Sequence, residues 1–79
     1  MAKKTIQHLF GERVRVLRQK QGLSQEELAY RAGIHRTYLG GIERGERNPA
    51  LKNIAAMAEA LEVSLFDLFH FEERGNKPK

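Results

Sequence analysis

Apolar residues near the start of the chain recur with a regular spacing. They are separated by 4, 4 and 3 residues, at Ile6, Phe10, Val14 and Leu17. This is the period of one face of an α-helix, and it predicts a helix over residues 6–21 with a glycine at its end. Gly11 lies inside that helix, where glycine is expected to weaken it by about 1 kcal/mol relative to alanine.

Two shorter helices are predicted next. Ser24 is followed three positions later by Glu27, a spacing at which each side chain can cap a backbone N–H of the other and so start a helix. Gly33 fits the left-handed residue that ends this helix. The next helix is expected over residues 35–44, with a leucine and an isoleucine on its inward side. Its outer side carries Arg36, Thr37, Gly40, Gly41 and Arg44.

The second half of the chain predicts two more helices. The first runs over residues 49–61, with Pro49 in its first turn and Met57 beside its apolar stripe. The stripe expected to face the core consists of Leu51, Ile54, Ala55, Ala58 and Leu61. The last helix runs over residues 65–71, and Ser64 is its expected N-cap.

Length and composition set the class of the protein. Its 79 residues predict an all-α fold, one compact domain of five helices over residues 6–71, with a loose arm over residues 1–5 and a flexible tail over residues 72–79. The chain has no cysteine, which excludes disulfides and thiolate metal sites and fits a reducing cytoplasm. No apolar run approaches the roughly 20 residues of a membrane helix, so a cytoplasmic protein without a membrane partner is expected.

The sequence offers no signature of an enzyme. It has no glycine-rich phosphate loop, no paired carboxylates in a plausible pocket and no cysteine nucleophile. Its three histidines, His8, His35 and His70, lack the spacing of zinc ligands. No metal, cofactor or small-molecule effector is therefore expected. The formal charge of +4 fits either simple solubility or a polyanionic partner.

The outer side of the third predicted helix is suited to the major groove of DNA. Arg36 can donate two hydrogen bonds to O6 and N7 of guanine, and Thr37 can contact a phosphate or a thymine methyl group. Gly40 and Gly41 would let the helix axis approach the bases, leaving base reading to the two side chains before them or to DNA shape. These four residues are the predicted base contacts. Tyr38 has two open roles, packing beneath the helix or contacting the DNA backbone.

Six short segments match one known family in register: 22–29 (GLSQEELA), 32–34 (AGI), 42–45 (IERG), 47–49 (RNP), 54–55 (IA) and 60–61 (AL). Over roughly residues 9–69 the chain resembles the helix-turn-helix proteins of the phage-repressor/Cro type, the Xre family. At residues 36–38 and 41–44 it is most similar to the controller proteins of restriction–modification systems. The resemblance implies a lambda-repressor-like fold and a homodimeric transcriptional regulator. Such a protein binds double-stranded DNA at a two-fold symmetric operator, with the third helix in the major groove.

The resemblance also implies roles for individual residues. Gln25 corresponds to the phosphate-contacting glutamine of the family, at a helix N-terminus where anions bind. Arg18 is expected to pair with Glu43 and to tie the first helix to the third. The remaining expected phosphate contacts are Tyr38, Arg44, Arg47, Asn48 and Lys52.

The last predicted helix is too apolar for a short terminal helix with one buried side. Its surplus aromatic residues indicate a partner, unless they fold back over the core. A dimer through this helix would place two copies of the third helix about 34 Å apart, one turn of DNA. The predicted dimer residues are Phe66, Phe69, His70 and Phe71.

Two other functions stay open at this point. One is an antitoxin-type DNA binder that also neutralises a toxin, and the other is a protein-interaction adaptor of the same fold. An adaptor would carry apolar residues on the outer side of the third helix, where this chain carries arginine and threonine. A regulator bound over a promoter would exclude RNA polymerase, and one bound upstream would recruit it, so RNA polymerase is a further candidate partner.

Overall fold

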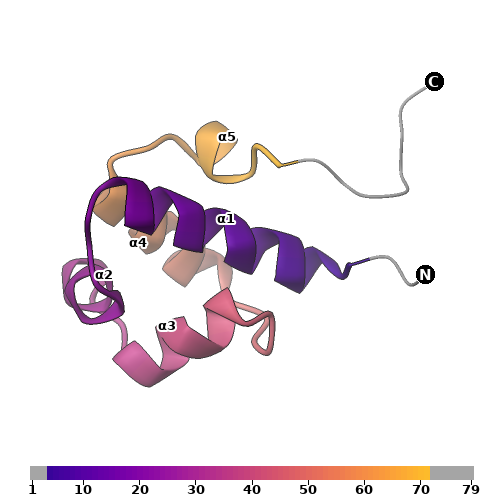
Figure 1. Ribbon diagram of the computed structural model, residues 1–79, viewed down its shortest axis with the longest axis horizontal. Coiled ribbons are helices and arrows are strands. Elements are labelled where there is room, and N and C mark those ends of the chain that lie inside the picture. Colours follow the sequence, from indigo (N-terminus) through magenta and orange to yellow (C-terminus); the bar gives the residue numbers. More distant parts are fainter. Residues whose placement is uncertain (1–3, 72–79) are drawn as a thin grey trace.

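The computed structural model describes residues 4–71; the predictions for residues 1–3 and for the tail 72–79 lie outside this range. Within it the chain forms five helices and no strand, so the predicted all-α fold is confirmed. They are α1 (Ile6–Lys20), α2 (Gln25–Ala32), α3 (Arg36–Glu43), α4 (Leu51–Leu61) and α5 (Leu65–Leu68). The long α1 crosses the middle of the molecule, with α3 on one side and α5 on the other (Figure 1). It packs against both, while α2 packs against α3 and α4.

The folded domain begins before α1. Thr5 is the N-cap of this helix, and its hydroxyl accepts a hydrogen bond of 3.1 Å from the backbone N–H of His8. Lys4 forms an ion pair of 2.6 Å with Glu12. The prediction of a loose arm over residues 1–5 is therefore wrong for Lys4 and Thr5. At the other end of α1, Gly22 takes the left-handed conformation with φ of 71°.

The starts of α2 and α4 differ in how well the sequence predicts them. At α2, the Ser24 hydroxyl accepts from the Glu27 N–H at 3.0 Å, and the Glu27 carboxylate accepts from the Ser24 N–H at 2.8 Å. The predicted capping box is thus present. Pro49, by contrast, does not lie in the first turn of α4, because Ala50 after it is extended, with ψ of 152°, and the helix begins at Leu51.

The last helix is shorter than predicted. The Ser64 hydroxyl caps α5 by accepting from the Asp67 N–H at 3.0 Å, but the helix ends at Leu68 instead of residue 71. Arg13 of α1 binds the C-terminal end of α5, because the Nε and Nη2 atoms of Arg13 donate hydrogen bonds to the Asp67 carbonyl at 3.0 and 2.8 Å. This contact fixes α5 on α1.

The core side of α4 is rotated from the predicted stripe. Met57 is fully buried, whereas Leu51 is 78% exposed and Ala55 is also exposed. Ala55 lies about 100° of helix rotation beyond the half-buried Ile54, on a side of α4 that is open to solvent. The buried residues of the core are Phe10, Val14, Leu17, Leu23, Leu28, Ala29, Leu39, Ile42, Met57, Ala58, Leu61 and Leu68.

Gly11 is where α1 crosses α3. A Cβ at this position would overlap the carbonyl oxygen of Ile42 and would lie 2.8 Å from that of Glu43. The glycine thus permits the close approach of the two helices, and its unfavourable helix propensity is offset by that packing. From the sequence alone it counted only as a weak point.

Candidate nucleic-acid interface

A tight turn joins α2 to α3. Gly33 takes the predicted left-handed conformation, with φ of 71°. Its N–H bonds the Tyr30 carbonyl at 3.2 Å, and the Ile34 N–H bonds the Ala29 carbonyl at 3.0 Å. These bonds satisfy the last carbonyls of α2 and set the direction of α3, which lies on the side of the molecule opposite α5 (Figure 1).

The start of α3 presents its polar side chains to solvent. Arg36 and Thr37 are exposed, as a base-reading role requires. They border a shallow groove of about 400 Å³ together with Tyr30 and Glu26 of α2. Tyr30 is 87% exposed and was not predicted as part of the site, because a tyrosine on the polar side of a helix gives no distinctive sequence signal.

The two glycines of α3 do not lie on an open surface. Gly40 and Gly41 are both buried. The side chains of Arg44 and Arg47 cover them, at 3.2 Å and 2.8 Å from where their Cβ atoms would be. The predicted base contacts of the two glycines would therefore require the two arginines to move.

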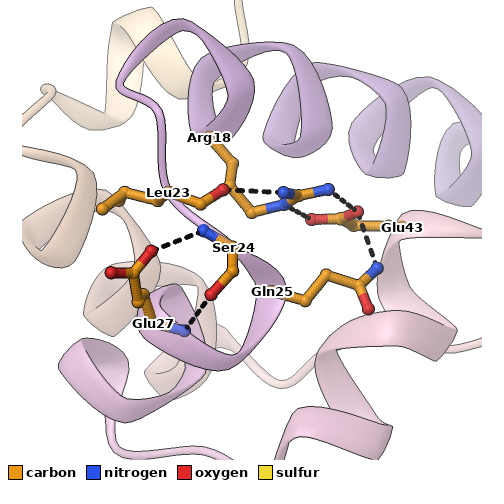
Figure 2. Close-up of polar contacts among 6 residues, drawn as sticks. All are labelled: Arg18, Leu23, Ser24, Gln25, Glu27 and Glu43. Atoms are coloured by element: carbon orange, nitrogen blue, oxygen red, sulfur yellow. Dashed lines mark hydrogen bonds and ion pairs between the residues drawn. The ribbon is translucent and has the colours of Figure 1, made fainter.

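A buried polar network holds the N-terminus of α2 to the end of α3 (Figure 2). Arg18 donates to both carboxylate oxygens of Glu43, at 2.7 and 3.0 Å, and to the Leu23 carbonyl at 2.8 Å. The two side chains of the ion pair are only 11% and 3% exposed. The hydrogen bond with Glu43 raises the pKa of Arg18, while burial acts in the opposite direction.

The same network fixes Gln25. Its Nε2 donates to Glu43 at 3.0 Å, which points the side chain from α2 toward α3 (Figure 2). The amide keeps one N–H that this bond does not use. The structure therefore joins the predicted phosphate contact to the predicted ion pair, a connection that sequence spacing does not reveal.

The loop after α3 carries two further arginines with different contacts. Arg44 pairs with Glu46 at 3.0 Å in an exposed position. This hydrogen bond raises the pKa of Arg44 and lowers the pKa of Glu46. The guanidinium carbon of Arg47 lies 5.8 Å from the centre of the Tyr38 ring, a cation–π distance.

Tyr38 takes the packing role of its two alternatives. It is half-buried against the core, and its hydroxyl accepts a hydrogen bond of 3.4 Å from Asn53. The role of Asn53 in holding this ring was not predicted. Asn48 and Lys52, the remaining predicted phosphate contacts, are exposed around the start of α4.

The aromatic residues at the C-terminal end divide into two groups. Phe69 stacks on the core residue Phe10, with ring centres 5.2 Å apart, and contacts Phe71, which is half-buried. Phe66 remains 78% exposed beside His70. Folding back over the core thus accounts for part of the predicted dimer surface, and Phe66 is its most exposed aromatic residue.

Residues 24–43 form two helices joined by a tight turn, and the sequence comparison agrees with this arrangement. Residues 14–68 match the family model described as helix-turn-helix. The chain belongs to the Xre-type helix-turn-helix family. This confirms the resemblance found in the sequence, including its similarity to controller proteins.

The curated relatives include control proteins. C.BamHI of Bacillus amyloliquefaciens is 47% identical over 72 residues, which cover 90% of this chain and 89% of the relative. C.SmaI of Serratia marcescens is 45% identical over 60 residues, 76% of this chain and 71% of the relative.

Solved structures of controller proteins are also similar to this helix-turn-helix protein. The restriction–modification controller protein C.AhdI of Aeromonas hydrophila is 48% identical, has a TM-score of 0.77 and aligns over 78% of this chain and 94% of its own. The controller protein C.Esp1396I, in the structure of its tetramer with its natural 35 base-pair operator, is 32% identical with a TM-score of 0.76. That alignment covers 84% of this chain and 91% of the neighbour.

Residues 4–71 contain neither a membrane-spanning helix nor a cluster of metal-binding side chains. None of the helices there is long and apolar enough to cross a membrane. No group of three or more histidine, aspartate or glutamate side chains in the same range is placed to hold a metal ion.

Proposed function

We propose that this protein is a sequence-specific, double-stranded DNA-binding regulator of transcription that acts as a homodimer on a two-fold symmetric operator. The observation that carries the proposal is the exposed pair Arg36 and Thr37 at the start of a helix held by a buried ion pair. A side chain that reads bases works best on a rigidly held helix, from which it can reach the DNA. The protein would act in the cytoplasm, where such a regulator meets its DNA.

Electrostatics support this proposal. Four exposed cations lie on α3, on the loop after it and on the start of α4: Arg36, Arg44, Arg47 and Lys52. Cations placed around a groove-binding helix supply affinity that does not depend on sequence, by contacting phosphates and releasing counterions. Gln25, directed toward α3 by Glu43, would add a contact to the phosphate backbone.

The comparisons support the regulator over the adaptor. The controller protein C.Esp1396I forms a tetramer in complex with its natural operator. An adaptor of the same fold would present apolar side chains on the outer side of α3, whereas this chain exposes Arg36 and Thr37 there. The proposed dimer surface is centred on Phe66 of α5, with Leu65 also 47% exposed beside it.

The test is selection from a random double-stranded DNA library at moderate salt. The wild type should enrich a two-fold symmetric site. Arg36→Ala should lose about 1–3 kcal/mol for that site and should lose its preference at one base position in each half-site. Gln25→Ala should keep the site and weaken binding to all sequences alike.

Arg15→Ala provides the matched control. Arg15 is an exposed arginine of α1, so the variant removes the same charge without touching α3. It should enrich the same site as the wild type. A wild type that enriches no sequence would refute specific DNA recognition, and an unchanged base preference in Arg36→Ala would exclude Arg36 as the reader.

A further inference from the structure

The side chain of Arg47 lies across Gly41. A Cβ at position 41 would be 2.8 Å from Cγ of Arg47, 3.2 Å from its Nε and 3.6 Å from its Cδ. Most of the length of the arginine therefore occupies the space that any larger residue at position 41 would fill. The backbone reinforces the arrangement, because the Glu46 N–H bonds the Gly41 carbonyl at 2.9 Å.

The guanidinium of Arg47 then reaches Tyr38. Tyr38 is three residues before Gly41, so the two lie on the same side of α3. The guanidinium carbon is 5.8 Å from the ring centre, and Asn53 holds the ring through its hydroxyl. The arginine thus runs along α3 from the glycine to the tyrosine.

The neighbouring glycine makes a different contact. A Cβ at position 40 would be 3.2 Å from Nη1 of Arg44 and 3.7 Å from Oε1 of Gln25. Gln25 lies at an ordinary van der Waals distance, and the closer group is the far end of the flexible Arg44 side chain, which can shift readily. Gly40 and Gly41 both weaken the helix relative to alanine, but only Gly41 lies against the stem of an arginine.

We propose that Gly41 is a positioning residue for Arg47: the missing side chain lets Arg47 lie against Tyr38, so that its cation is oriented before DNA binds. The assignment of DNA as the ligand of Arg47 rests on the proposed function. Gly41 then acts through Arg47 and not by approaching a base itself. A fixed arginine loses less conformational freedom on binding than a free one.

The first test needs no DNA. The Tyr38 ring should shift the NMR signals of the Arg47 side chain, and Tyr38→Leu gives the unshifted reference. Gly41→Ala should move these signals to the reference position, because the methyl group displaces the arginine. Gly40→Ala is the matched control, with the same gain in helix propensity, and should keep the shifted signals. Unchanged Arg47 signals in Gly41→Ala would overturn the proposal.

The second test measures DNA affinity in a double-mutant cycle. Gly41→Ala should weaken binding to the selected operator roughly 2- to 12-fold, the range that ordering one free long side chain represents. In the Arg47→Ala background the same change should have no further effect. An equal loss in both backgrounds would mean that the new methyl group meets the DNA directly, and would overturn the positioning role.

The outcomes separate this inference from the proposed function. If the wild type binds its operator and Arg47→Ala binds it equally well, Arg47 is not a DNA contact and only the inference fails. If the wild type selects no sequence, the proposed function fails together with the DNA role of Arg47. The NMR experiment still decides whether Gly41 seats the arginine.

Discussion

Removal of one partner of the Arg18–Glu43 ion pair is expected to destabilise the domain more than removal of both. Breaking a buried pair leaves an uncompensated charge and costs about 3–5 kcal/mol, whereas replacing both partners by apolar residues of similar size is often neutral or stabilising. A domain of 79 residues has a total stability of about 4–12 kcal/mol. Each single substitution should therefore remove a large part of it.

The structure predicts which single substitution is worse. In Arg18→Met, the carboxylate of Glu43, 3% exposed, keeps only the hydrogen bond from Gln25. In Glu43→Leu, the guanidinium of Arg18, 11% exposed, still donates to the Leu23 carbonyl. We expect a loss of about 5 kcal/mol for the first and about 3 kcal/mol for the second. The double variant should lose less than either.

Urea denaturation followed by far-UV circular dichroism would measure these free energies of unfolding. The control is the same cycle at Lys4 and Glu12, an ion pair of which each side chain is about half exposed. Exposed pairs contribute less than about 1 kcal/mol, and salt weakens them further. Additive losses at Arg18 and Glu43, or an equally large coupling at the control pair, would refute the reasoning.

Three further changes test other parts of the structure. Gly11→Ala should lower the free energy of unfolding, measured by urea denaturation, by about 2 kcal/mol. Overpacking against α3 costs about 3 kcal/mol and outweighs a gain in helix propensity of about 1 kcal/mol. A more stable variant would exclude the close crossing of α1 and α3. Phe66→Glu should shift sedimentation toward monomer, and a surviving dimer would move the interface elsewhere. Hydrogen bonds from Ser24 lower the pKa of Glu27. The stabilising contribution of Glu27 is thus present above its unfolded-state pKa and is lost as the pH falls through its lower folded-state pKa. Glu27→Gln should therefore make the free energy of unfolding depend less on pH in the acid range. The same pH dependence in the variant and the wild type would contradict this.

The helix boundaries that the sequence predicted well depend on short-range interactions. The capping box of Ser24 and Glu27 and the left-handed Gly33 involve residues within a few positions of each other. Such contacts form wherever the backbone takes the corresponding turn, so their spacing is visible in the chain itself. The less accurate boundaries, at Pro49 and at the end of α5, lack a comparable local signal.

The candidate site was only partly predictable, for the same reason. The exposure of Arg36 and Thr37 follows from their position on the polar side of a helix. The burial of Gly40 and Gly41 depends on where the arginines of the following loop lie, and no periodicity encodes the path of a loop.

Spacing and capping signals in the chain alone predict five helices, their order, the caps Ser24, Gly33 and Ser64, and the family to which the chain belongs. The packing of the helices against one another, which no spacing pattern reveals, makes Gly11 necessary where α1 crosses α3, buries Met57 in place of Ala55, and lays Arg47 across Gly41. Spacing and capping are properties of neighbouring residues. Close approach and burial depend on the angle and distance at which separate helices pack, and these are set by the whole core at once.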